Sequence, residues 1–186
     1  TDASYRGTVD LKTFLPEGRL RVDRLEAEGH RFRGTFNVSH ESESISLESD
    51  ALLIDSSIRL TPISLRANLS DIQENRVDFR SNFSFGPTRL PVDEDSNQSD
   101  IDSPLLDVDN SVHIDGSVSI SSQTSVEMFF KVRSAPLYPV LADFAPQLVE
   151  ESVPTHHLLV STEGFFSGNL SDYRFSLHPF EMRDLA

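Results

Sequence analysis

The chain has 186 residues, enough for one domain with a sizeable core, and contains 13 phenylalanines but neither tryptophan nor cysteine. Its 30 acidic and 16 basic residues give a net charge of −14. That charge argues against a nucleic-acid partner and against electrostatic docking on anionic lipid headgroups, since both need a clustered basic surface. Without cysteine, the chain has no disulfides, thiolate nucleophiles or thiolate metal sites.

Most of the chain alternates between apolar and polar residues, the pattern of a β-strand with one buried face. Tyr5–Lys12 alternates strictly, Pro16–Gly18 has the composition of a turn, and Gly29 and Glu41–Ser44 mark further turns. Pro62 interrupts one strand and predicts a sheet edge or a bulge. About ten or eleven strands are expected, in the segments 5–12, 20–27, 32–40, 45–47, 51–54, 58–69, 77–85, 112–120, 126–132, 158–160 and 165–177.

Two segments depart from this pattern. Residues 91–110 are rich in Asp, Glu, Ser, Asn and Gln and cannot bury enough apolar surface to offset their ordering entropy. We therefore expect an acidic loop or linker there, inside a single β-rich domain of residues 1–186. Tyr138–Ser152 carries apolar residues at helical spacing and predicts one short helix, which Pro146 would kink or split.

A short motif recurs in four strands: an apolar residue, a Gly two residues later, and a second apolar residue two further on. A Gly on the apolar face leaves room for a bulge, a strong twist or close packing, so the repeat predicts a long sheet that can curl. The tetrapeptide Asn-Leu-Ser-Asp also recurs, at residues 68–71 and 169–172. The four motifs are Tyr5-Gly7-Val9, Phe32-Gly34-Phe36, Ile114-Gly116-Val118 and Phe166-Gly168-Leu170.

No catalytic or metal-binding motif is evident. The sequence lacks a nucleophile elbow, a phosphate-cradling glycine loop and a His-Glu-x-x-His helix. Residues 93–99 resemble the start of a calcium loop, but Gln98 and Pro104 stand where such a loop needs Gly and Glu. The sequence therefore predicts a non-enzymatic protein with no cofactor and no metal site.

The open question is what covers the apolar face of so many strands. An antiparallel sheet hides that face against a second sheet, a helix layer, or itself as a barrel, and one short helix is too little. The expected fold is all-β: a curled antiparallel meander sheet forming a groove, or alternatively a sandwich or flattened barrel. Apolar burial is worth roughly 25 cal/mol per Å², so a bare groove calls for lipid chains or a partner.

The segments Phe32-Arg-Gly-Thr-Phe-Asn-Val, Ile114-Asp-Gly-Ser-Val-Ser-Ile and Phe166–Leu177 resemble those of the bacterial AsmA-like proteins (AsmA, TamB and YdbH relatives) and the shorter type II secretion protein N. The resemblance implies a periplasmic envelope protein of Gram-negative bacteria, anchored in the inner membrane, with a curled hydrophobic groove that carries phospholipid. The chain starts at Thr1 and has no apolar run long enough to cross a bilayer, so we expect an anchor upstream.

The sequence thus predicts a groove for phospholipid or another acyl-chain ligand, serving lipid transport or outer-membrane assembly, with envelope proteins as further partners. The alternative is a β-sandwich with a dry core, acting as a structural or protein-interaction domain. In the first case the helix would plug one end of the groove. The candidate lipid-binding residues are Phe32, Phe36, Phe79, Phe83, Phe85, Phe130, Leu141, Phe144, Phe166 and Phe175.

Overall fold

The structure is a computed structural model that describes residues 2–10, 15–27, 29–55, 58–86, 88–89, 105–106, 109–121, 124–137, 158–169 and 172–184. Its strands are β1 (Asp2–Val9), β2 (Pro16–Ala27), β3 (His30–Glu41), β4 (Ser44–Ser49), β5 (Leu52–Ile54), β6 (Ile58–Asn68), β7 (Arg76–Phe85), β8 (Thr88–Arg89), β9 (Leu105–Leu106), β10 (Ser111–Ser119), β11 (Ser125–Pro136), β12 (Leu158–Gly168) and β13 (Tyr173–Asp184).

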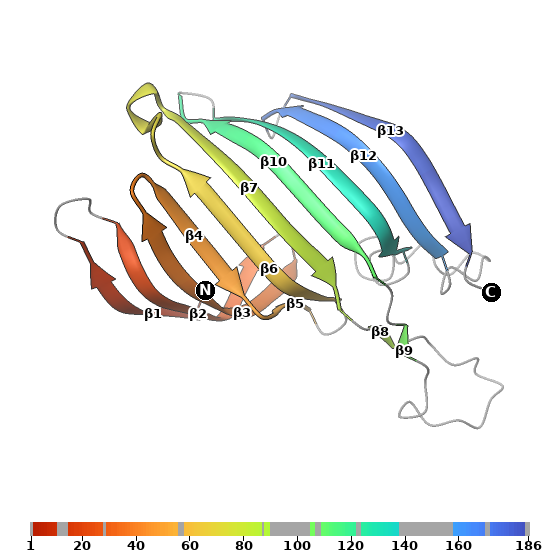
Figure 1. Ribbon diagram of the computed structural model, residues 1–186, viewed down its shortest axis with the longest axis horizontal. Helices are drawn as coiled ribbons and strands as arrows, with labels where there is room; N and C mark the ends of the chain where they lie inside the picture. The colour runs from red at the N-terminus through yellow and green to blue at the C-terminus, as the bar shows by residue number, and fades with distance from the viewer. Residues whose placement is uncertain are drawn as a thin grey trace.

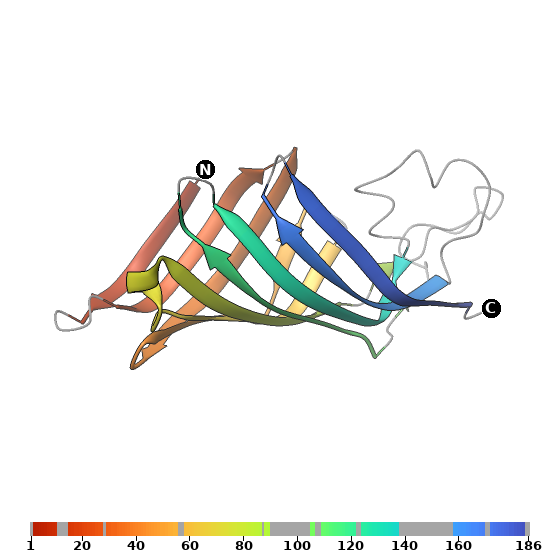
Figure 2. The ribbon, with the colours of Figure 1, turned by 90° about the horizontal axis from the view of Figure 1, so that it is seen from above.

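Eleven of these strands form one antiparallel sheet, in the order β1-β2-β3-β4-β6-β7-β10-β11-β12-β13, with β5 paired to β3 and β6. The sheet is a single continuous layer with β1 and β13 as its edges (Figure 1). Seen from above, β1–β3 slope the opposite way from β10–β13, as the twist of neighbouring strands accumulates (Figure 2). The predicted curled antiparallel meander sheet is confirmed.

Little regular structure lies outside this sheet in the described residues. It consists of the β8–β9 ribbon and a single-turn 3₁₀ helix, Ile72–Glu74, between β6 and β7. A second sheet that could form a sandwich is therefore not among the described elements. The expected helix at Tyr138–Ser152, with Leu141 and Phe144, lies outside the described residues.

Most of the acidic segment 91–110 also lies outside the described residues, but its last part belongs to the fold. Leu105–Leu106 forms β9, and Asn110 is buried beside the end of β7. The Asn110 side chain accepts a hydrogen bond from the Phe85 N–H (2.7 Å) and donates one to the Phe85 carbonyl (2.9 Å). Asn110 therefore anchors this end of the segment to the sheet, where a solvated loop was expected.

Of the turns and the strand interruption predicted from Gly and Pro residues, one turn is absent from the structure. Gly29 has φ of +85°, as a turn residue does, and the register shifts between Leu60 and Ile63, so the bulge predicted at Pro62 is confirmed. The turn predicted at Pro16–Gly18 is wrong, because β2 already begins at Pro16, opposite Val9. A proline is tolerated there since the first residue of a strand can lack a ladder hydrogen bond.

The repeated Asn-Leu-Ser-Asp tetrapeptide ends a strand both times. Asn68 Oδ1 accepts a hydrogen bond from the Ser70 N–H (3.1 Å), and Asn169 Oδ1 accepts one from the Asp172 N–H (2.9 Å). An Asn side chain that bonds the backbone two or three residues on closes a turn locally. The repeat therefore marks equivalent strand ends after β6 and β12.

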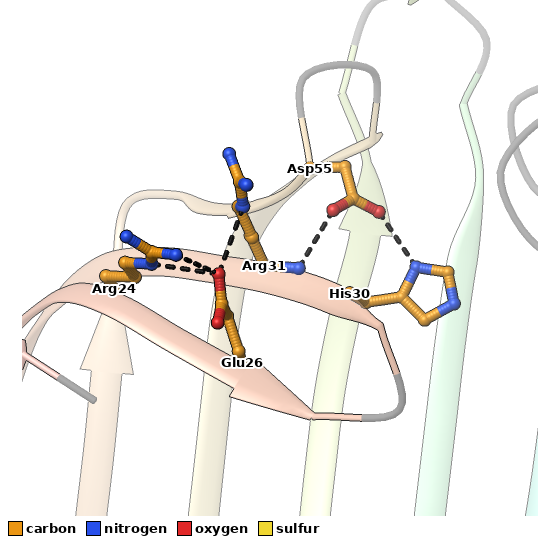
Figure 3. A network of polar contacts seen from close by, with 5 residues as sticks. All are labelled: Arg24, Glu26, His30, Arg31 and Asp55. Atoms are coloured by element: carbon orange, nitrogen blue, oxygen red, sulfur yellow. Dashed lines mark hydrogen bonds and ion pairs between the residues drawn. The ribbon is translucent and has the colours of Figure 1, made fainter.

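Asp55, which follows β5, ties that short strand to the start of β3 (Figure 3). Its Oδ2 lies 2.8 Å from His30 Nδ1, its Oδ1 accepts the Arg31 N–H at 2.8 Å, and its own N–H donates to the Arg31 carbonyl at 2.7 Å. The hydrogen bond from His30, and then that from the Arg31 backbone, lower the pKa of Asp55. Nearby, Arg24 and then Arg31 lower the pKa of Glu26.

The Asp55 contact predicts a pH-dependent stability. A carboxylate whose pKa is lowered by folding stabilises the protein fully above the ordinary aspartate pKa, about 3.9, and this stabilisation is lost as the pH falls through the folded-state value. Asp55→Asn should therefore be less stable than the wild type at neutral pH. The gap should shrink below about pH 4, as measured by urea unfolding across the acid range. A gap that stays constant with pH would contradict this assignment.

Candidate functional site

The strand register collects the large apolar side chains on one face of the sheet, here called the apolar face. One row of paired residues runs across four strands: Val38 of β3, Leu47 of β4, Leu65 of β6 and Ser81 of β7. Side chains two residues along a strand share a face, so the register places all eight predicted residues that are described on the apolar face: Phe32, Phe36, Phe79, Phe83, Phe85, Phe130, Phe166 and Phe175.

Bulges preserve this face where the alternation breaks. Leu177 and Phe180 are three residues apart, yet they stand opposite Gly164 and Thr162, which are two apart. The extra residue in β13 lies between His178 and Phe180, so the edge strand keeps its apolar side chains on one face. Strict alternation therefore missed the end of this strand; the signal that could have found it is Pro179, since proline in a strand marks a bulge.

The apolar face is poorly covered, above all along β13. None of the described side chains reaches full burial. Tyr173 is 62% exposed and Phe175 56% exposed, and three further apolar residues of β13 are exposed as well: Leu177, Phe180 and Met182. A long, exposed, apolar edge strand is a feature that soluble proteins usually avoid or cover.

Most of the buried apolar residues in the described part of the chain lie at one end of the sheet; Leu15 and Val38 lie away from it. Ile58 and Leu60 at the start of β6, Val112 near the start of β10, and Leu159 and Val160 at the start of β12 are all buried. At the opposite end, Ile72 and Ile120 are exposed. The described sheet is therefore best packed at the end near β8 and β9.

Two glycines on the apolar face, Gly116 of the recurring motif and Gly164 outside it, each give a neighbouring aromatic ring a place to lie. A Cβ built on Gly164 would be 2.5 Å from Phe130 Cζ, and one on Gly116 would be 2.7 Å from Phe79 Cζ. The Phe130 ring lies over Gly164 of β12 and stacks on Phe175 of β13, with centroids 5.6 Å apart and planes at 11°. The glycine thus lets a ring cross a whole strand, which is how glycine and aromatic residues combine in curved sheets.

This arrangement predicts that Gly164→Ala is destabilising. The new Cβ would meet both the Phe130 ring and the Ser176 carbonyl oxygen. Overpacking of this kind costs about 1–3 kcal/mol, which denaturant unfolding measures directly. Ser39→Ala, on the exposed polar side of β3, is the control and should change stability by less than about 0.5 kcal/mol. A neutral Gly164→Ala would show that the ring does not need the glycine.

The opposite face, here called the polar face, carries charged and hydroxyl side chains. Some of the charged side chains form ion pairs between neighbouring strands. Arg80 Nε donates to Asp115 Oδ1 at 2.5 Å, and Lys131 Nζ lies 3.0 Å from Glu163 Oε2. The Arg80 hydrogen bond lowers the pKa of Asp115, and a hydrogen bond from His113 lowers it further. These contacts link β7 to β10 and β11 to β12, so they stabilise the register.

An exposed apolar pair interrupts the polar face. Phe129 of β11 and Phe165 of β12 stand opposite each other and are 41% and 42% exposed. They lie on the other side of the sheet from Phe130 and Phe166, because neighbouring residues of a strand point to opposite faces. Phe129 and Phe165 are therefore exposed aromatic residues on the polar face, and their substitution can serve as a control for substitutions on the apolar face.

No three His, Asp or Glu side chains among the described residues gather closely enough to hold a metal ion. No described helix has the length and apolar character needed to cross a bilayer. No protein-family model, curated protein or solved structure matches the chain. The resemblance to the AsmA-like proteins stays a prediction.

Proposed function

We propose that this protein is a non-enzymatic lipid-binding domain of the bacterial envelope, which holds the acyl chains of phospholipid against its apolar face. The observation that carries the proposal is the single described layer of sheet with its large apolar side chains on one side and exposed aromatic residues along β13. The periplasmic setting, the inner-membrane anchor and a role in lipid transport or outer-membrane assembly follow from the resemblance to AsmA-like proteins.

The dimensions of the face suit a lipid chain. Neighbouring strands lie about 4.8 Å apart, so ten strands in a row give an apolar surface on the order of 40 Å long across the sheet. Stacked rings such as Phe166 and Tyr173, with centroids 5.8 Å apart, give part of that surface a continuous aromatic lining. Such a surface contacts hydrocarbon along its length without specific polar groups.

The curl of the sheet favours an inner apolar face. Side chains on the inner side of a curved sheet converge, and aromatic rings that lie over Gly116 and Gly164 show such crowding on the apolar face. The polar face, with ion pairs such as Arg80–Asp115, then faces outward. A trough with a hydrocarbon floor and a charged exterior would shield acyl chains in an aqueous compartment.

Two matched double variants test the proposal. Phe175→Ser with Leu177→Ser removes exposed side chains from the apolar face, whereas Phe129→Ser with Phe165→Ser removes exposed side chains from the polar face. A phenylalanine buries 150–250 Å² at about 25 cal/mol per Å². The first variant should therefore lose lipid affinity by about tenfold or more, and the second should keep it.

The measurement is native mass spectrometry and lipid extraction of the purified proteins. We expect phospholipid with the wild type and with Phe129→Ser/Phe165→Ser, and much less with Phe175→Ser/Leu177→Ser. Equal loss in both variants, or a lipid-free wild type that also fails to take up added phospholipid, would contradict the proposal. The dry-core interaction domain would then be the better interpretation.

A further inference from the structure

We infer that an arginine-lined hollow on the polar face of β1–β3 is a binding site for a phosphate group. The hollow has a volume of about 690 Å³, and its lining includes Ser4, Arg6, Arg19, Arg21 and Asn37. All five side chains carry hydrogen-bond donors, and no described acidic residue lines the hollow. The chain has a net charge of −14, so this hollow has the opposite sign of charge from the protein as a whole.

Two of these arginines face each other, and neither forms an ion pair with a carboxylate in the described part of the chain. Arg6 of β1 stands directly opposite Arg19 of β2, and like charges directly opposite in a sheet are destabilising. Neither guanidinium is in an ion pair with a described residue. Glu17, two residues before Arg19, stands opposite Thr8 and does not line the hollow.

The other opposed arginine pair of the described sheet shows what a purely structural pair looks like. Arg66 stands opposite Arg80, but each has its own carboxylate: Arg66 Nη2 lies 3.2 Å from Glu41 Oε2, and Arg80 Nε lies 2.5 Å from Asp115 Oδ1. No described carboxylate forms an ion pair with Arg6 or Arg19. An anion bound from solution would therefore reduce the repulsion between these two guanidinium groups.

A phosphate group fits this set of donors better than a simple halide. Guanidinium groups bind phosphate oxygens through two parallel hydrogen bonds, and here Arg6 and Arg19 approach from adjacent strands, with the Asn37 amide opposite Arg19 on β3. Arg21 contributes a weaker attraction because its Nε already donates to Asp23 Oδ1 at 2.7 Å. The site therefore offers two guanidinium groups that no described carboxylate neutralises and one that is partly neutralised.

The hollow borders one rim of the sheet. Arg6 belongs to the edge strand β1, whose other face carries Tyr5 and Val9. A phosphate bound there could be the headgroup of a lipid whose chains reach over the rim, or a free phosphate ester. The two sources share the same recognition chemistry and differ only in the contribution of the acyl chains.

Calorimetric titration of the intact chain with inorganic phosphate, at ionic strength matched with chloride, tests the site. A lost charged hydrogen bond is worth enough to weaken binding by about tenfold, so Arg6→Gln and Arg19→Gln should each show that loss. Arg19→Lys should bind at an intermediate level, since it keeps the charge and loses the planar fork. Arg24 lies on β2, as Arg19 does, but does not line the hollow. The Arg24→Gln variant is therefore the control and should bind phosphate like the wild type.

Stability supplies a second readout. Without phosphate, Arg19→Gln should melt at the wild-type temperature or above it, because the substitution relieves the repulsion from Arg6. With phosphate, the wild type should gain more thermal stability than Arg19→Gln, as binding to the folded state requires. No phosphate binding by the wild type, or an equal loss in Arg24→Gln, would overturn the inference.

Titrations with glycerol 3-phosphate and with dihexanoylphosphatidic acid distinguish the two sources. Tighter binding of the phosphatidic acid would identify a lipid headgroup, and equal binding would identify free phosphate esters; both support the site. Because inorganic phosphate has no acyl chain, the first titration does not depend on the apolar face. The phosphate site and the lipid-binding proposal can therefore fail independently.

Discussion

The constraint on which this structure depends is that a strand places alternate side chains on opposite sides of a sheet. Across the described strands the antiparallel register aligns that alternation, so aromatic and aliphatic residues from Tyr5 to Met182 share one face. A single layer cannot bury such a face by itself. The exposed Tyr173 and Phe175 are the visible result, and the proposed lipid binding follows from the need to cover that surface.

Glycines on the apolar face reconcile a long sheet with close side-chain packing. Gly164 lets the Phe130 ring lie across β12 and reach Phe175, and Gly116 does the same for Phe79 on the neighbouring pair of strands. A side chain at either glycine would push the ring away from the sheet. These two glycines therefore let aromatic rings lie close against the sheet and line its apolar face.

The two faces have different electrostatic roles. Ion pairs such as Arg80–Asp115 and Lys131–Glu163 connect neighbouring strands on the polar face and oppose slippage of the register. The Arg6–Arg19 pair at the β1 edge departs from this rule, since two positive charges meet there without a described carboxylate in contact. What sets this pair apart is that the two arginines stand directly opposite each other, where a bound anion would reduce their repulsion.

Much of the fold could be read from the sequence, because side-chain direction follows from local backbone geometry. Alternation in Phe32–His40 and Val77–Phe85 correctly placed Phe36, Phe79 and Phe83 on one apolar face, and Pro62 marked a bulge. The tertiary structure alone decided which residues meet across strands, since backbone hydrogen bonds are the same in every register. That is why the Phe130–Gly164 contact and the opposed Arg6 and Arg19 could not be predicted.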